Sequence, residues 1–100
     1  MIARVTLAEI DTLRTNVRRA VGVFESSVLP ELREQRGYEG CTVLTTPEGK
    51  ALVATFWQTP EDADASVESG SYGAQVEKFV TVMAAPPGRD TYEVTLRDEP

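Results

Sequence analysis

The chain has 100 residues, with 16 acidic and 10 basic side chains and no His, which gives a formal net charge of −6 at pH 7. This length predicts one small globular domain over residues 1–100, and the acidic balance argues against nucleic-acid and anionic-membrane partners, which need clustered Lys and Arg. The missing His and the single Cys exclude imidazole catalysis, zinc clusters and intramolecular disulfides, and they favour a reducing, cytoplasmic location.

The first predicted elements are a strand and a long amphipathic helix. Residues 2–7 alternate apolar and polar side chains, which is the period of a strand. A helix is expected from Asp11, a plausible N-cap, to about Arg36, with Gly37 at its end. Pro30 predicts a kink or a short break just before it. The apolar stripe of this helix recurs every three or four residues and comprises Leu13, Val17, Val21, Phe24, Val28 and Leu32.

The middle of the chain predicts a β-hairpin followed by a capped helix. Residues 41–45 and 51–57 are rich in β-branched and apolar side chains, and Pro and Gly in the segment between them favour a turn. The second run has apolar residues at both odd and even positions, so both faces of this strand are expected to be covered. Thr59 precedes Pro60 and an acid stands three residues after the Thr, which predicts a helix start and a helix to about Glu68.

The last third predicts a second helical stripe and a fourth strand. The stripe comprises Tyr72, Val76, Phe79 and Met83. Pro86 and Pro87 end this stretch, residues 91–96 form the strand, and residues 97–100 form a loose tail. The resulting order β-α-β-β-α-β predicts a ferredoxin-like α+β fold with a four-stranded antiparallel sheet. Because the helices cover one face only, the doubly apolar third strand predicts a homodimer that packs sheet to sheet.

Two motifs carry a resemblance to a known family. The junction from strand to helix reads ATFWQTPEDADAS over residues 54–66, and GYEG follows the long helix at residues 37–40. Both resemble the antibiotic-biosynthesis-monooxygenase-like (ABM) family of dimeric α/β barrels, in which a strand commonly ends in Trp before a polar residue, a capping Ser or Thr and acids. The resemblance covers nearly the whole chain and implies that fold. The family includes cofactor-free oxygenases, haem-degrading enzymes and members without assigned chemistry.

The site residues of the family carry over only in part. In the haem-degrading branch a His about nine or ten residues after the Trp ligates iron, but this span holds Ser66 and Val67 here, and the first-strand Asn of that branch has no counterpart in residues 4–6. We therefore expect no haem degradation, and neither a cofactor nor a metal. In the branch that oxidises polycyclic phenols an Asn precedes the Trp by about four residues, where this chain has Val53. Of that branch's residues only Trp57 matches.

The resemblance leaves a cofactor-independent oxygenase as one interpretation. An electron-rich hydroxyaromatic can react with dioxygen through its own anion, so the protein need only bind it, promote its deprotonation and stabilise charge. Trp57 and Glu25, the latter as a base, are the candidate catalytic residues. Tyr72, Tyr92 and Arg18 are the candidate substrate-binding residues, the tyrosines as aromatic walls and the arginine to steady an anion.

Each of these candidate residues also has a structural interpretation. The three aromatic residues can be packing residues, and Glu25 and Arg18 can belong to a solvated helix flank. The alternative function is a non-catalytic ligand-binding or interaction module of the same fold. In either case the expected partners are a second copy of the chain and a small aromatic or apolar molecule.

Overall fold

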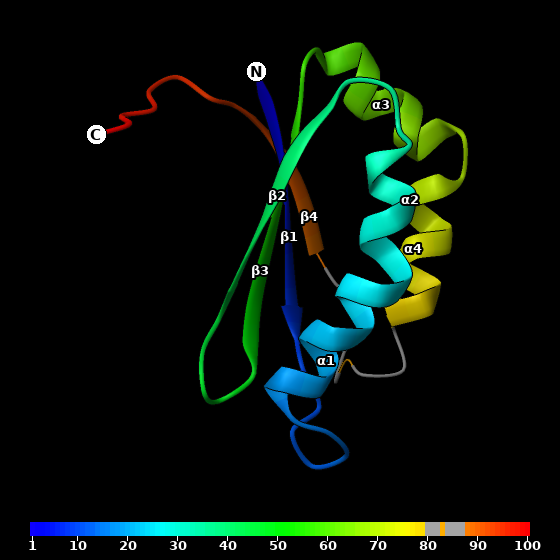
Figure 1. The fold of residues 1–100 in the computed structure, drawn as a ribbon, viewed down its shortest axis with the longest axis vertical. Coiled ribbons are helices and arrows are strands. Elements are labelled where there is room, and N and C mark those ends of the chain that lie inside the picture. Colours follow the sequence, from blue (N-terminus) through cyan, green and yellow to red (C-terminus); the bar gives the residue numbers. More distant parts are fainter. Residues whose placement is uncertain (80–82, 84–87) are drawn as a thin grey trace.

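The computed structural model describes residues 1–79, 83 and 88–100. Its elements follow the predicted order (Figure 1). They are β1 (Ile2–Glu9), α1 (Val17–Val23), the π-helical segment η1 (Phe24–Val28), α2 (Leu29–Arg33), β2 (Tyr38–Thr45), β3 (Lys50–Trp57), α3 (Pro60–Glu68), α4 (Ser71–Phe79) and β4 (Gly88–Glu93).

The strands form one antiparallel sheet in the order β2-β3-β1-β4. The helices of the described residues all lie against one face of this sheet, and none of them lies on the opposite face (Figure 1). This arrangement confirms the ferredoxin-like α+β fold that the order of elements predicts. Among the described residues, no helix is long and apolar enough to cross a membrane.

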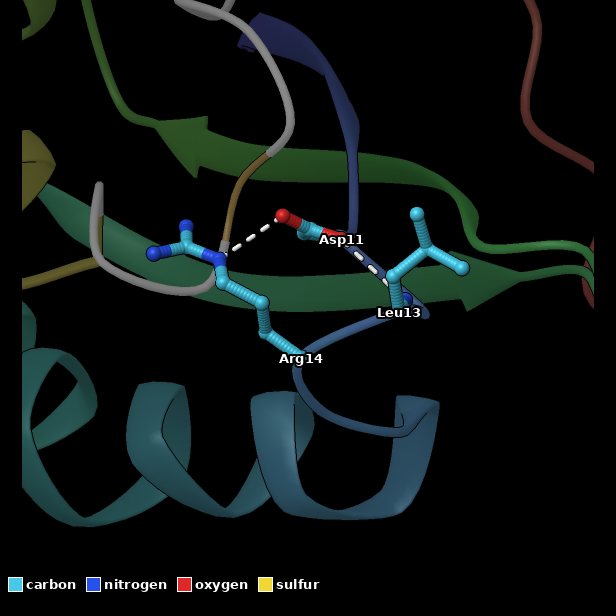
Figure 2. A network of polar contacts seen from close by, with 3 residues as sticks. All are labelled: Asp11, Leu13 and Arg14. Atoms are coloured by element: carbon cyan, nitrogen blue, oxygen red, sulfur yellow. Dashed lines mark hydrogen bonds and ion pairs between the residues drawn. The ribbon is translucent and has the colours of Figure 1, made fainter.

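The long helix starts later than its apolar pattern predicts. Asp11 closes a separate turn, in which its carboxylate accepts the Leu13 N–H at 3.1 Å and the Arg14 Nε–H at 2.7 Å (Figure 2). Helix α1 begins after Asn16, whose side chain accepts the Arg19 N–H at 2.8 Å. Leu13 therefore lies outside the helix and is 97% exposed. The prediction of an N-cap at Asp11 was wrong because an Asp side chain stabilises a local turn as readily as a helix start.

The break expected near Pro30 takes the form of a π-helical segment. At the end of η1 the Leu29 N–H reaches back five residues to the Phe24 carbonyl, and α2 begins with Pro30 in its first turn. A proline lacks the N–H and crowds the carbonyl four residues before it, so a wider turn and a new helix start accommodate it. Helix α2 ends at Arg33, earlier than the expected Arg36.

The predicted hairpin and the predicted capped helix are both present. Strands β2 and β3 pair antiparallel over their length, with an irregularity between Tyr38 and Gly40. The Thr59 hydroxyl accepts the Asp62 N–H at 3.1 Å at the start of α3. These signals are local in the chain, which is why the sequence suffices to locate them.

The C-terminal elements depart from the predicted boundaries. Met83 is not part of the α4 stripe but forms an isolated bridge with Ile10. Strand β4 spans 88–93 instead of 91–96. It pairs with β1, and because Glu93 already pairs with Ile2, the first residue of β1, later residues find no strand partner there. The Pro86–Pro87 pair and the Phe79 side chain lie outside the described residues.

The register places the polar residues of β1 beneath the helices. Arg4 pairs with Thr55, and Thr6 pairs with Val53, on the face that the helices cover. The alternate residues of β1, among them Val5 and Leu7, belong to the face without helices. The core on the covered side comprises Ile2, Ala8, Ile10, Ala20, Phe24, Val28, Leu32, Ala51, Val53, Trp57, Ala63 and Met83.

Candidate functional site

An apolar pocket lies between the helices and the covered face of the sheet. It holds about 500 Å³ of empty space, including the space at its open mouth. Mainly apolar walls with a few polar groups are typical of small-molecule sites. The described residues that line the pocket are Arg4, Thr6, Ala8, Phe24, Val28, Leu32, Val53, Thr55, Tyr72, Val76 and Met83.

Arg4 carries the charge of this pocket. The residue is 2% exposed, and its guanidinium carbon lies 4.9 Å from the ring centroid of Trp57 and 4.8 Å from that of Tyr72. Its Nη1 donates a hydrogen bond to the Ala63 carbonyl at 3.1 Å. A desolvated cation over an aromatic ring gains about 2 kcal/mol, so both rings hold the guanidinium in place.

The charge state of Arg4 reflects its surroundings. Burial lowers the pKa of Arg4; Tyr72 raises it, the neighbouring charge of Arg89 lowers it, and Asp64 raises it. Because the pKa of an arginine lies far above neutral pH, the guanidinium stays protonated there even after this lowering. The pocket therefore contains a permanent positive charge.

Trp57 lies behind Arg4 and is not among the described lining residues. Its side chain is fully buried, and its Nε1–H donates to the Thr55 hydroxyl at 2.9 Å. The Tyr38 ring meets it edge to face, with the centroids 5.8 Å apart and the planes at 72°. Trp57 thus affects the pocket indirectly, because its ring contacts the Arg4 guanidinium and Arg4 lines the pocket.

Tyr72 contributes an aromatic wall and a hydroxyl from α4. Its hydroxyl oxygen lies 3.2 Å from the Thr6 Oγ1, and either atom can donate the hydrogen bond. Its ring faces two cations, since the guanidinium carbons of Arg4 and Arg89 both lie 4.8 Å from its centroid. The ring of Tyr72 thus contacts the Arg4 guanidinium while its hydroxyl contacts Thr6, and all three residues line the pocket.

The structure brings together two of the five residues named from the sequence, Trp57 and Tyr72. Glu25 and Arg18 are exposed on the helical layer and do not line the pocket. Tyr92 is 52% exposed and pairs with Ala3 on the face without helices.

Sequence reasoning missed Arg4, Thr6 and Thr55. The available signal was the alternation of Arg4 and Thr6 with the apolar residues of β1, and this alternation does not say which face the helices cover. Thr55 belongs to a run that is apolar at both parities, so the sequence does not single it out.

A second and more polar pocket lies on the other side of Arg4. It holds about 480 Å³ of empty space, including the space at its open mouth. Arg4 lines both pockets and is the buried charge of each. The described residues that line this second pocket are Arg4, Ala63, Asp64, Val67, Glu68, Arg89 and Thr91.

The described residues contain no cluster for a metal ion and no imidazole for a haem. No group of three or more Cys, Asp or Glu side chains among them is arranged to hold a metal ion. Where the haem-degrading branch has its ligating His, this chain has the buried Ser66 and the half-buried Val67, neither of which ligates haem iron as an imidazole does. Burial raises the pKa of the Cys41 thiol to about 11, which disfavours the thiolate that would bind a metal.

Comparison with known proteins identifies the fold. No family model matches the sequence, and no curated protein matches it. Among solved structures, the chain is similar to a monooxygenase from the gene ActVA-Orf6 of Streptomyces coelicolor, solved in complex with nanaomycin D. That match has a TM-score of 0.78 at 14% identity and covers 99% of this chain and 91% of the other.

Two further structures show how varied the chemistry on this fold is. SnoaB, a cofactor-independent oxygenase from Streptomyces nogalater, matches with a TM-score of 0.73 at 10% identity over 98% of this chain and 94% of its own. The haem degrader MhuD of Mycobacterium tuberculosis, with two haems in its active site, matches with a TM-score of 0.75 at 16% identity over 99% and 100%. These likenesses confirm, at the level of the fold, the resemblance that the two sequence motifs carry. The chain therefore has the fold of the ABM-like monooxygenases.

Proposed function

We propose that the chain binds a small hydroxyaromatic molecule in the apolar pocket and promotes its reaction with dioxygen without a metal or a flavin. The observation that carries this proposal is the pocket itself, whose polar side chains Arg4, Thr6 and Tyr72 lie together against otherwise mostly apolar walls. The fold adds support, because the similar structures include a cofactor-independent oxygenase and a monooxygenase in complex with nanaomycin D.

The proposed reaction needs no redox-active group from the protein, because the substrate itself reduces O₂. A phenol loses its proton to water, and the resulting anion donates electrons to O₂, so that a C–O bond forms at a ring carbon that carries hydrogen. The hydroperoxide then loses water to leave a carbonyl, and the sum is phenol plus O₂ to quinone plus H₂O. The substrate supplies the four electrons that reduce O₂, so no further reductant is needed.

The protein's share is binding, orientation and charge stabilisation. The Tyr72 hydroxyl and the Thr6 hydroxyl can orient the oxygen of a substrate, and the apolar walls exclude bulk water from the reacting ring. Trp57 acts as a positioning residue, since it supports Arg4.

One observation favours the alternative of a non-catalytic binding module. Among the described lining residues of the apolar pocket there is no carboxylate or imidazole that could accept the substrate proton. Glu25, the base named from the sequence, is exposed and does not line the pocket. A module that only binds its ligand would need no such base.

Oxygen consumption separates the two functions. The protein is incubated with a panel of hydroquinones and polycyclic phenols in an oxygen electrode, and binding of the same compounds is measured by calorimetry. We expect uptake above the spontaneous rate for at least one compound, and a reduction of about tenfold or more in Tyr72→Phe, because an orienting hydrogen bond is lost. Arg19→Gln, at an exposed position of α1 outside the pocket, should keep the parent's rate. Binding without uptake by the parent would leave the binding module as the function.

We further propose that the working unit is a homodimer that pairs the two faces without helices. Large apolar side chains on this face are exposed in the single chain: Leu7 is 58% exposed and Leu44 is 57% exposed. Two outward residues of β3 on the same face are half-buried: Leu52, which pairs with both Leu7 and Leu44, and Phe56 further along the strand. A second copy of the same face would remove this apolar surface from water.

A further inference from the structure

We infer that the ligand of the apolar pocket is an organic anion whose negative group binds the guanidinium of Arg4. The inference rests on the proposed function in one respect, which is that a small aromatic molecule enters this pocket. It goes further in naming the charge of the ligand and the residue that selects it.

Arg4 is a buried cation for which the described residues provide no ion pair. Only 2% of the residue is exposed. The ion pairs among the described residues join Arg14 to Asp11, Arg36 to Asp62 and Arg97 to Glu99, and none of them includes Arg4. A buried charge is costly unless an opposite charge or enough hydrogen-bond acceptors surround it.

The hydrogen-bonding capacity of Arg4 is also mostly unused. A guanidinium has five N–H donors in a planar fork, and the described residues accept one hydrogen bond from it, at the Ala63 carbonyl. Tyr72 and Trp57 contact the guanidinium through their rings, not through an acceptor atom. The fork therefore retains donors for a carboxylate or a phenolate, which it can bind through two parallel hydrogen bonds.

Because the rest of the pocket is mostly apolar, the charge of Arg4 should favour anionic ligands over neutral ones. Arg4 is the one charged side chain among the described residues that line it. A neutral ligand could accept hydrogen bonds from the guanidinium but would leave its charge uncompensated, whereas an anion would accept stronger hydrogen bonds and neutralise the charge. The aromatic part of the ligand would lie among apolar walls such as Phe24, Val28 and Val53.

The charged groups of the second pocket do not remove this preference. Asp64 and Glu68 are exposed to solvent, so water and salt screen their effect on a ligand at Arg4. Arg89 is exposed as well, and its guanidinium carbon lies 4.8 Å from the Tyr72 ring centroid, so its positive charge does not oppose an anion at Arg4. The closest fixed charge to a ligand in the apolar pocket is thus positive.

A matched pair of compounds tests the inference. Binding of 2-naphthoate and of 2-naphthamide, which has nearly the same shape without the charge, is measured by isothermal titration calorimetry at pH 7. We expect the naphthoate to bind the parent protein at least about tenfold more tightly, since a hydrogen-bonded charge pair contributes about 1.4 kcal/mol or more. Equal affinities, or tighter binding of the amide, would overturn the inference while leaving ligand binding in this pocket intact.

Variants assign the preference to Arg4. Arg4→Gln should abolish the difference between the two compounds, and Arg4→Lys should keep part of it because the charge remains without the fork. Arg19→Gln, which removes an exposed charge on α1, should keep the full difference. If a folded Arg4→Gln protein still prefers 2-naphthoate, the assignment to Arg4 is overturned. If that variant does not fold, the preference of Arg4→Lys is compared with that of the parent, and an unchanged preference would overturn the assignment. Binding of neither compound would overturn the inference, and calorimetry with the panel of hydroquinones and polycyclic phenols then decides the proposed function separately.

Discussion

Arg4 lies in a series of side chains in which rings and cations alternate. Trp57, Arg4, Tyr72 and Arg89 follow one another at 4.9, 4.8 and 4.8 Å between guanidinium carbon and ring centroid. Each contact fixes the orientation of its neighbour, so the position of the buried charge depends on two aromatic residues that belong to different elements. A change at Trp57 should therefore alter ligand binding even though this residue does not line the pocket.

Tyr72 allows the ring and the hydroxyl to be tested separately. Tyr72→Phe keeps the ring that supports Arg4 and loses the hydroxyl that contacts Thr6, whereas Tyr72→Leu loses both. We expect Tyr72→Phe to retain the preference for 2-naphthoate over 2-naphthamide and Tyr72→Leu to lose much of it. Calorimetry with the two compounds checks this, and a loss in both variants would show that the hydroxyl, not the ring, positions Arg4.

The single thiol gives a pH-dependent prediction. Cys41 pairs with Thr55 on the covered face, and burial raises its pKa from 9.0 to about 11. Only the thiolate is alkylated, so at pH 8 the native protein should react with iodoacetamide at least about tenfold more slowly than the chain in denaturant. The folded thiol holds its proton more tightly than the unfolded one. Its contribution to the free energy of unfolding should therefore be fully present below about pH 9 and decline as the pH rises toward 11. Equal alkylation rates in the two states would contradict this.

The helix start can be tested at the scale of the element. If α1 begins after Asn16, then Asn16→Ala removes an N-cap and should lower the free energy of unfolding by about 1 kcal/mol. Asp11→Ala should have a smaller effect, because the turn that it closes is exposed and precedes the helix. Urea denaturation of both variants measures the difference. A larger loss at Asp11 would restore the helix start expected from the sequence.

The junction between α2 and β2 depends on a glycine. Gly37 has a φ of +78°, and a Cβ atom there would collide with the Asp62 side chain of α3. Its carbonyl accepts the Gln58 N–H at 2.8 Å, which ties the loop to the end of β3. The close approach of the loop to α3 therefore leaves room for no side chain at this position.

Replacing this glycine should destabilise the fold. We expect Gly37→Ala to lower the free energy of unfolding by about 2 kcal/mol or more, from the left-handed backbone and the collision together. Gly22→Ala is the matched control: its Cβ would meet nothing within 4 Å in α1, so it should stabilise the protein by about 0.5–1 kcal/mol. Thermal or urea unfolding of the pair measures both signs, and the same sign for both would contradict the account.

At the scale of the whole molecule, one face of the sheet is covered and the other is not (Figure 1). Dimer formation through the open face predicts that the parent sediments at twice the 10.9 kDa mass of one chain at micromolar concentration. Leu7→Glu combined with Leu44→Glu should give a folded monomer, since charged side chains would then be buried between the sheets. Leu13→Glu, in the exposed turn before α1, should leave the dimer intact. A monomeric parent would refute the dimer.

The amino-acid sequence by itself determines the order of the elements and several of their boundaries. The Thr59–Pro60 start of α3, the hairpin of β2 and β3, and the break before Pro30 all depend on residues close together in the chain. Capping, turn formation and the missing N–H of proline act over a few residues, so their signals are readable locally. The resemblance to the monooxygenase fold follows from the same local motifs.

The tertiary structure alone decides what the site is made of. Whether the polar or the apolar side of β1 lies beneath the helices depends on which face the distant helices cover, and the alternation of Arg4 with its neighbours is the same in both cases. The meeting of Arg4, Trp57 and Tyr72 joins three elements that are far apart in the chain. The absence of His and the acidic net charge narrowed the chemistry, but the buried positive charge that organises the pocket becomes visible only once the sheet and the helices are packed together.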